Sequence, residues 1–264
     1  LVRLKQTDHG ILRNGIWAYT NERLCKDDLI TVQIVENECS DNIAPVNLPL
    51  DIAYEDDDII VINKPFDMPA HPSAGNHDNT LANALMYYYG SQNKPFVYRC
   101  INRLDRDTTG LTIVAKHALA GGILGNAVAK RAIHRTYYAV CSGCTPICMR
   151  ISAPIARKDA STIERCVDFK RGENAVTDFI RIKYNPDNNL SLVKLRLLTG
   201  RTHQIRVHMK YIGFPLIGDF LYNPDYTYIS RQALHSGRLV FTHPVTGQKI
   251  NLISDIPSDM KSLF

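Results

Sequence analysis

The chain has 264 residues, enough to bury a substantial hydrophobic core in one large domain, alone or with a small appendage. Its formal charge of +5 and its pI near 8.8 permit a polyanionic partner without requiring one. No apolar run reaches the roughly eighteen residues of a membrane-spanning helix, and the 7 scattered cysteines favour reduced thiols, so we expect a cytoplasmic protein without membrane association.

Residues 1–48 predict a small N-terminal module or extension, and residues 49–264 predict the main domain. Segments 10–16 and 26–34 have the composition of short strands around turns. Within the first of them, Asn14-Gly15 is a dipeptide typical of tight hairpin turns. A linker that contains Asn and Pro then leads into the main domain.

The main domain alternates predicted strands and helices. Short apolar or alternating runs predict strands at 58–63, 111–115, 137–141, 176–184, 190–198, 239–241 and 250–253. Capping residues and helical spacing predict helices at 79–90, 117–131 and 202–211. Because strands outnumber helices and many are joined by short turns, the sequence predicts an α+β fold. We expect a largely antiparallel or mixed central sheet with flanking helices.

Two charged segments stand out. Residues 102–110 place Asp105 and Asp107 among arginines, and residues 199–208 open a predicted helix that carries Arg206. A carboxylate from one element and a guanidinium from another can form a buried ion pair, which would fix the Asp and favour its ionised form. Each segment alone also fits a plainer interpretation, a salt-bridged turn or a basic surface helix.

Four segments, in the same order along the chain, resemble the signatures of the RluA family of pseudouridine synthases. The string RLDRDTTGL at 103–111 is similar to the family's HRLDxxTSG motif, and TGRTHQIRVH at 199–208 is similar to its C-terminal signature. Residues 59–72 resemble the motif VVNKPxGxxxHP, and residues 135–140 resemble the motif K-x-Y-x-A. The resemblance spans about residues 51–258.

The chain departs from the family pattern at two positions. Asn102 stands where the family usually has His, which removes a titratable group but keeps the capacity to hydrogen-bond. Thr109 replaces Ser and retains the hydroxyl. We expect the first change to alter a local contact more than activity. Residues 1–48 also faintly resemble the last part of a small RNA-binding module that some family members carry, without its basic helical first half.

The resemblance implies the pseudouridine synthase fold and the conversion of uridine to pseudouridine in RNA. This reaction breaks a nitrogen–carbon glycosidic bond and rejoins the uracil through carbon 5. Nothing is oxidised and nothing leaves, so we expect no cofactor and no metal. The expected partner is structured RNA, ribosomal or transfer, from which the target base must first be flipped. No required protein partner is evident.

The same resemblance assigns candidate catalytic residues. Asp105 would be the catalytic carboxylate, either as nucleophile or as general base, and Asp107 competes for this role less well. Arg206 would be the buried partner of Asp105, on a helical face shared with Thr202. Tyr137 would stack on the uracil; without the motif, a Tyr in a strand is more often a core residue.

Four further residues are candidate RNA contacts. Arg103 would help to open the RNA and fill the space of the flipped base, or simply contact phosphate. Arg201 and His203 would lie where a helix N-terminus favours phosphate. Lys210 would extend this basic face along the helix.

Other functional classes fit less well. The spacing of Cys141, Cys144 and Cys148 could supply three metal ligands, but these residues end a strand and enter a turn, so we expect no metal site. A catalytically silent RNA-binding protein would not need Asp, Tyr and Arg together. A hydrolase with paired carboxylates would need them farther apart than Asp105 and Asp107.

Overall fold

The computed structural model describes residues 7–19, 21–34, 36, 38–40, 42–73, 75–159, 161 and 163–264. Its strands are β1 (Ile11–Arg13), β2 (Ile16–Trp17), β3 (Ile30–Val32), β4 (Ile52–Glu55), β5 (Ile59–Lys64), β6 (Arg99–Cys100), β7 (Thr109–Ala115), β8 (His134–Ser142), β9 (Cys148–Ser152), β10 (Ile155–Arg157), β11 (Arg165–Val167), β12 (Val176–Asn185), β13 (Leu190–Leu197), β14 (Leu234–Thr242) and β15 (Lys249–Ile253). Its helices are α2 (Leu81–Gly90), α3 (Ala118–Ala129), α4 (Gln204–Tyr211) and α5 (Ser258–Lys261). Within the described ranges, the helices are too short or too polar to cross a membrane.

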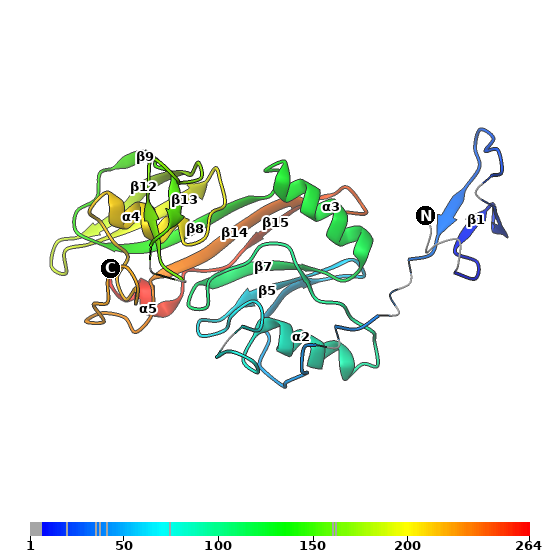
Figure 1. Cartoon of the computed structure of the whole chain (residues 1–264), viewed down its shortest axis with the longest axis horizontal. Coiled ribbons are helices and arrows are strands. Elements are labelled where there is room, and N and C mark those ends of the chain that lie inside the picture. The colour runs from blue at the N-terminus through cyan, green and yellow to red at the C-terminus, as the bar shows by residue number, and fades with distance from the viewer. Residues whose placement is uncertain are drawn as a thin grey trace.

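Strands β1, β2 and β3 form a small antiparallel sheet in the order β2-β1-β3. Asn14 and Gly15 both have positive φ, 53° and 81°, as the tight turn between β1 and β2 requires. Figure 1 shows this sheet at one end of the molecule, joined to the remainder by an extended segment. Residues 1–6 lie outside the described residues, and the assignment of residues 1–48 to a module of their own stays a prediction.

The main sheet has the order β4-β5-β7-β14-β8-β13-β12-β9, with β15 on β14 and β6 on β7. Its ladders are antiparallel, except that β7 and β14 run parallel through the pairs Thr109 with His235 and Gly110 with Ser236. A two-residue parallel ladder therefore joins the two halves of the sheet. The predicted α+β class with a mixed sheet is confirmed.

Strand β5 shows why residues 59–62 of the predicted run 58–63 are all apolar. Ile60 and Ile62 pack with α2, whereas Ile59 and Val61 pack with α3 and β14. Because successive side chains of a strand point to opposite faces, both faces of β5 are covered. A strand buried on both faces needs a continuous rather than an alternating apolar pattern.

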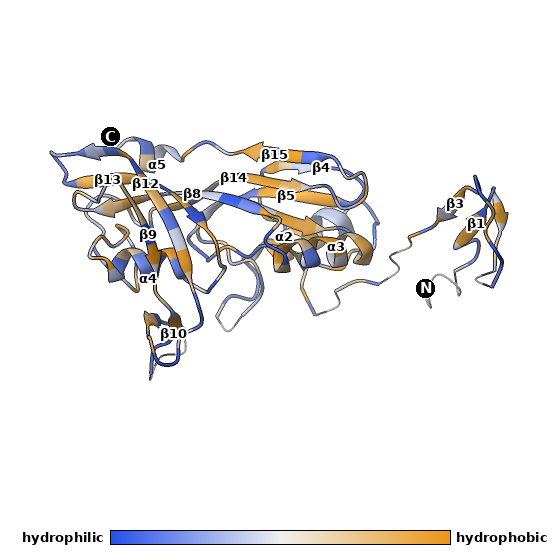
Figure 2. Cartoon of the chain, turned by 90° about the horizontal axis from the view of Figure 1, so that it is seen from above, coloured by the Kyte–Doolittle hydropathy of each residue, from blue (hydrophilic) through white to orange (hydrophobic). Residues whose placement is uncertain are grey.

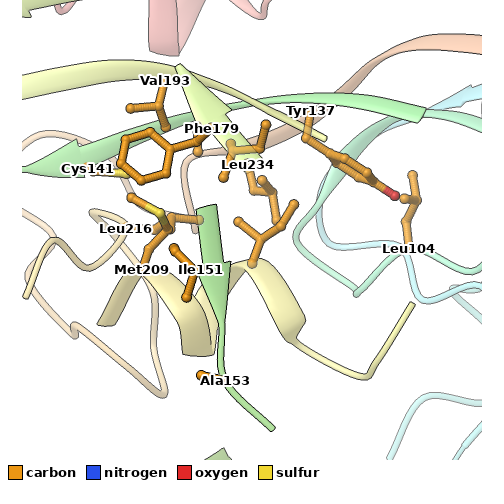
Figure 3. Packing of buried hydrophobic residues seen from close by; sticks show 13 residues of the cluster. Leu104, Tyr137, Cys141, Ile151, Ala153, Phe179, Val193, Met209, Leu216 and Leu234 are labelled. Atoms are coloured by element: carbon orange, nitrogen blue, oxygen red, sulfur yellow. The ribbon is translucent and has the colours of Figure 1, made fainter. Parts of the chain in front are cut away.

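The other half of the sheet packs against α4. Tyr137 of β8, Phe179 of β12 and Val193 of β13 point to the same face of the sheet, where Met209 of α4 meets them (Figure 3). These residues form one buried cluster. The α4 helix is thereby fixed against the strand that carries Tyr137.

The structure corrects several sequence-based boundaries. The helix predicted at 202–211 begins at Gln204, because His203 has a left-handed φ of 56°. Thr202 consequently lies outside the helix and shares no helical face with Arg206. Strand β14 begins at Leu234 rather than at residue 239. Strands β4, β6, β9, β10 and β11 and helix α5 were not predicted.

The parallel ladder between β7 and β14 depends on Gly110. Its φ is 108°, and an added Cβ would lie 2.3 Å from the carbonyl oxygen of Ser236. We therefore expect Gly110→Ala to lower the free energy of unfolding by at least about 2 kcal/mol, from backbone strain and overpacking. Gly122→Ala in α3, where a Cβ meets no atom within 4 Å, is the control and should be neutral or mildly stabilising. Urea unfolding measures both, and equal stabilities would contradict the close approach.

Candidate active site

A cleft of about 660 Å³ opens between segments that are distant in sequence. Residues 70–73, 100–105 and 200–206 line it, together with Tyr137 of β8. Both charged segments singled out in the sequence therefore border one cleft.

Asp105 and Arg206 lie 101 positions apart in the chain and form a direct ion pair, in which Arg206 Nη1 donates to Asp105 Oδ2 at 2.9 Å. The same guanidinium donates through Nε and Nη2 to the two oxygens of Asp219, at 2.7 and 2.8 Å. The side chains of Arg206 and Asp219 are 2% and 0% exposed, whereas that of Asp105 is 30% exposed. The contact expected from the sequence is present, and a second carboxylate supports it.

The orientation of the guanidinium is set largely by residues other than Asp105. Asp219 Oδ1 also accepts the backbone N–H groups of Leu221 and Tyr222, at 3.1 and 3.2 Å. The ring of Tyr222 lies 5.0 Å from the Arg206 guanidinium. Burial would lower the pKa of Arg206, but its hydrogen bonds to Asp219 and the charge of Asp105 raise that pKa above its ordinary value. Arg206 thus remains a cation in a desolvated position.

Tyr137 forms part of the cleft wall. It is 4% exposed and packs with Leu104 and Leu234 (Figure 3). Tyr138 is less buried and points to the other face of the sheet, as the strand alternation predicts. The two interpretations left open by the sequence, a core residue and a cleft residue, therefore both describe Tyr137.

A buried lysine supports the loop that carries Asp105. Lys64 is 1% exposed, and its Nζ donates to the carbonyl oxygens of Pro65 and Arg106 at 2.7 and 2.9 Å. Burial lowers the pKa of Lys64 to about 7, against the opposing charges of Asp107 and Asp105. The loop is thus tied to the end of β5.

Asn102 connects the start of the same loop to β7. Its Oδ1 accepts the backbone N–H of Ile113 at 2.8 Å, and its Nδ2 donates to the carbonyl of Leu111 at 3.3 Å. The hydroxyl of Thr112 donates to the carbonyl of Asn102 at 2.6 Å. Asn102 is 3% exposed, so an amide fits this buried position with both of its polar atoms satisfied.

Comparisons with known proteins identify the family. Residues 58–211 match the family model described as RNA pseudouridylate synthase. The uncharacterized RNA pseudouridine synthase YhcT of Bacillus subtilis is 38% identical over 262 residues, which cover 99% of this chain and 84% of that protein. The ribosomal large subunit pseudouridine synthase D of Haemophilus influenzae is 41% identical, with 96% and 81% covered. The chain belongs to the RluA family of RNA pseudouridine synthases. It is therefore an isomerase that acts on RNA.

Solved structures agree with this assignment. The structure of human RNA Pseudouridylate Synthase Domain Containing 1 matches with a TM-score of 0.66 and 26% identity, over 78% of this chain and 83% of that one. Human RNA Pseudouridylate Synthase Domain Containing 4 has the same fold, with a TM-score of 0.65. The pseudouridine synthase fold predicted from the motifs is confirmed.

Two of the three cationic residues predicted to contact RNA line the cleft of the synthase, and the third does not. Arg103 and Arg201 line the cleft, and Arg135, which the sequence did not single out as a contact, lies there with them. The guanidinium of Arg201 pairs with Glu173, so part of its charge is neutralised. Lys210 is exposed on α4 and does not line the cleft.

His203 differs from its predicted surroundings. It makes no capping bond at the start of α4, and its Nδ1 shares a 3.0 Å hydrogen bond with the hydroxyl of Tyr222. Burial lowers the pKa of His203, although the charge of Asp105 opposes this effect. The side chain is therefore mostly neutral near pH 7 and adds a hydrogen-bonding group, rather than a cation, to the cleft wall.

The three clustered cysteines of the synthase do not come together as a group of metal ligands within the described ranges. Cys141 is buried and its pKa is raised by burial, whereas Cys144 and Cys148 are exposed. Cys144 Sγ instead accepts a hydrogen bond from Arg181 Nη1 at 2.6 Å.

Asp56, Asp58 and His243 do lie close enough together to be considered as metal ligands. His243 Nδ1, however, accepts the backbone N–H groups of Val245 and Thr246, at 3.3 and 3.0 Å. The proton of the neutral ring must then be on Nε2, which donates to Asp56 at 2.9 Å. This arrangement closes the β14–β15 hairpin onto the β4–β5 turn and leaves no lone pair on Nε2 for an ion.

Asp219 is the site residue that sequence reasoning missed. The available signal was Gly218 before it, because Gly218 has a φ of 66° and an added Cβ would lie 2.1 Å from the carbonyl oxygen of Arg231. Such a position marks an obligatory turn, but it does not reveal which cation the next residue meets.

We expect Arg206→Met and Asp219→Asn each to cost about 3 to 5 kcal/mol of stability, because each leaves a buried charge or polar group without its partner. The double variant should lose less than the sum, since the two residues are coupled. Arg231→Met is a matched control: its partner Asp259 is 41% exposed, so water can solvate the carboxylate left behind and the loss should be smaller. Urea unfolding followed by circular dichroism measures all four variants, and strictly additive losses would contradict the coupling.

Proposed function

We propose that Asp105 is the catalytic carboxylate with which this synthase converts specific uridines to pseudouridine in structured RNA, ribosomal or transfer. The observation that carries the proposal is the asymmetric exposure of the Asp105, Arg206 and Asp219 group. Asp105 is the partly exposed member of the group, whereas Arg206 and Asp219 are buried. One oxygen of Asp105 is held by the Arg206 guanidinium, which Asp219 fixes from the buried side. Within the described chain, its other oxygen has no hydrogen-bond partner and is available to a substrate.

The chemistry requires a charged carboxylate near the sugar. The nitrogen–carbon bond between ribose and uracil breaks, the uracil turns, and carbon 5 bonds to the ribose carbon. A base then removes the proton on carbon 5, and a proton is returned to the ring nitrogen released from the ribose, so atoms and charges balance without an external reagent. Arg206 holds one oxygen of Asp105, and the carboxylate serves either as nucleophile toward the ribose or as general base.

Tyr137 is proposed to hold the detached uracil. Its ring lines the cleft and is supported by Leu104 and Leu234, so the stacking surface is rigid. An aromatic face binds a planar base without a covalent bond. The Tyr137 hydroxyl is the proposed acceptor or relay for the carbon 5 proton.

Arg103, Arg201, His203 and Lys210 are proposed to contact the RNA. Arg103 is exposed at the mouth of the cleft beside Asp105, which suits a side chain that occupies the space of a flipped base. Arg201 and Lys210 are suited to phosphate contacts, and His203 to a neutral hydrogen bond. Several relatives are named for the large ribosomal subunit. Pseudouridine mapping of total RNA, with and without this protein, identifies the target.

Asp105→Asn should abolish isomerisation while RNA binding and stability stay nearly unchanged, because the substitution removes the charge and keeps the shape. Release of tritium from carbon-5-tritiated uridine in cellular RNA measures the reaction. Asp107→Asn is the control, since the Asp107 carboxylate holds the neighbouring Arg106 and should be dispensable for chemistry. Activity of Asp105→Asn within about tenfold of the parent, roughly 1.4 kcal/mol in barrier, would assign the chemistry to another residue.

Tyr137→Ala should bind RNA but turn over slowly, because the freed uracil loses its platform. Tyr137→Phe keeps the ring, so it should be slow only if the hydroxyl takes part in proton removal. Tyr138→Phe on the opposite face of the sheet is the control and should have parental kcat. Full activity of Tyr137→Ala in the tritium assay would mean that Tyr137 is solely a core residue.

A further inference from the structure

The main sheet has a second face that the cleft does not use. On β8, Tyr137 faces the cleft, so Thr136 and Tyr138 point to the opposite face. Helix α5 covers one end of that opposite face, where Met260 packs with Val140. Figure 2 shows α3 and α4 on one side of the strands and α5 on the other. Along β9, β12 and much of β13, the side chains of this face are exposed or half-buried.

The exposed part of this face carries a strip of basic side chains. We call the set of His134, Arg150, Lys194, Arg196 and Arg238 the back-face strip; all five residues are exposed. They come from β8, β9, β13 and β14, which lie in one sheet. The alternation of side chains places cations from β9, β13 and β14, together with His134 of β8, on one surface.

The strand register aligns three of these cations in one row. Arg150 pairs with Asp178, Asp178 with Arg196, Arg196 with Thr136, and Thr136 with Arg238. Neighbouring strands are about 4.8 Å apart, so Arg196 and Arg238 start from backbone positions about 10 Å apart. Lys194 lies two residues from Arg196 on the same face of β13.

Much of this positive charge has no counter-ion within the described residues. Asp178 is the carboxylate of the row, and Arg150 already occupies both of its oxygens at 2.7 and 2.8 Å. Arg238 donates to the neutral amide of Asn251 at 2.9 Å. Lys194 and Arg196 make no hydrogen bond or salt bridge to another described side chain. Adjacent like charges repel one another, and a bound polyanion would relieve that repulsion.

The same surface is hollowed. A depression of about 500 Å³ is lined by His134, Lys194, Arg196 and Arg238, together with Asp178, which is paired with Arg150. Ile180, which is 57% exposed, also borders it. A concave basic surface with an apolar side chain at its border suits a sugar–phosphate chain better than a flat array of lysines does.

We propose that the back-face strip binds the phosphodiester backbone of RNA, as a second contact outside the catalytic cleft. RNA is the occupant that fits, because the charge that remains after Arg150 pairs with Asp178 is positive, and this enzyme's substrate is a long polyanion of which only the target nucleotide needs to enter the cleft. Phosphate contacts of this kind add affinity and orientation without reading sequence. The proposal depends on the RNA substrate of the family and not on the assignment of Asp105.

The test is direct binding of an RNA that cannot occupy the cleft as substrate. The probe is a fluorescein-labelled RNA duplex of G·C pairs without uridine, measured by anisotropy over a series of salt concentrations. The variant is Lys194→Gln/Arg196→Gln/Arg238→Gln. We expect its Kd at low salt to rise at least about tenfold, and the slope of log Kd against log salt to fall by about 2 to 3.

Two controls test whether the change in salt dependence comes from the back-face strip. Lys94→Gln removes an exposed charge in the turn after α2 and should change the slope by less than about one. Lys158→Gln/Glu164→Gln removes a surface ion pair outside the strip without changing net charge, and should leave the slope unchanged. If the triple variant unfolds at a lower temperature than the parent, Lys194→Gln/Arg238→Gln replaces it, with a slope change of about 1 to 2 expected.

Activity assays separate this proposal from the catalytic one. In the tritium-release assay on cellular RNA, the triple variant should show a raised KM with parental kcat, whereas Asp105→Asn should bind the duplex like the parent. A triple variant that melts like the parent and keeps a Kd within twofold, with an unchanged salt slope, would overturn the proposal. Loss of kcat with intact duplex binding would overturn it as well.

Discussion

The buried contact of Arg206 with two carboxylates is the interaction on which the site depends. Asp219 occupies one edge of the guanidinium with two hydrogen bonds and is fully buried. The remaining Nη1 is left to meet Asp105 at the cleft. Because Asp219 already balances the charge of Arg206, Asp105 is not needed to neutralise a buried cation. The second oxygen of Asp105 has no hydrogen-bond partner within the described chain, as the proposed role of Asp105 requires.

The sheet brings this contact together from two halves. Asp105 precedes β7, while Tyr137 lies on β8 and Arg206 on α4, which packs against β8. A short parallel ladder, which includes Gly110 and Ser236, joins β7 to β14 and hence to β8. A glycine is required because the two backbones approach too closely for a Cβ. The geometry of the cleft therefore depends on backbone packing in the centre of the sheet.

The sequence predicted the elements that leave a local apolar pattern. It did not predict features that depend on which polar residues are buried by distant parts of the chain. Strands with continuous or alternating apolar runs were predicted, because burial on one or both faces leaves that pattern. Strands β10 and β11 have 3 residues each, too few for a period to be visible. The burial of Asp219 and Lys64 could not be predicted from the sequence, since both residue types are usually exposed. Their burial follows from partners far along the chain.

The charges of the catalytic group give it little attraction for the phosphates of RNA. Asp105, Arg206 and Asp219 together carry two negative charges and one positive charge, so the catalytic group itself repels phosphate. Arg103, Arg135 and Arg201 around the cleft offset this repulsion locally, although Glu173 neutralises part of Arg201. A nucleotide flipped into such a site is held by stacking and shape rather than by charge. Cations beyond the cleft add affinity for RNA, because they bind phosphate at a distance from the carboxylate of Asp105.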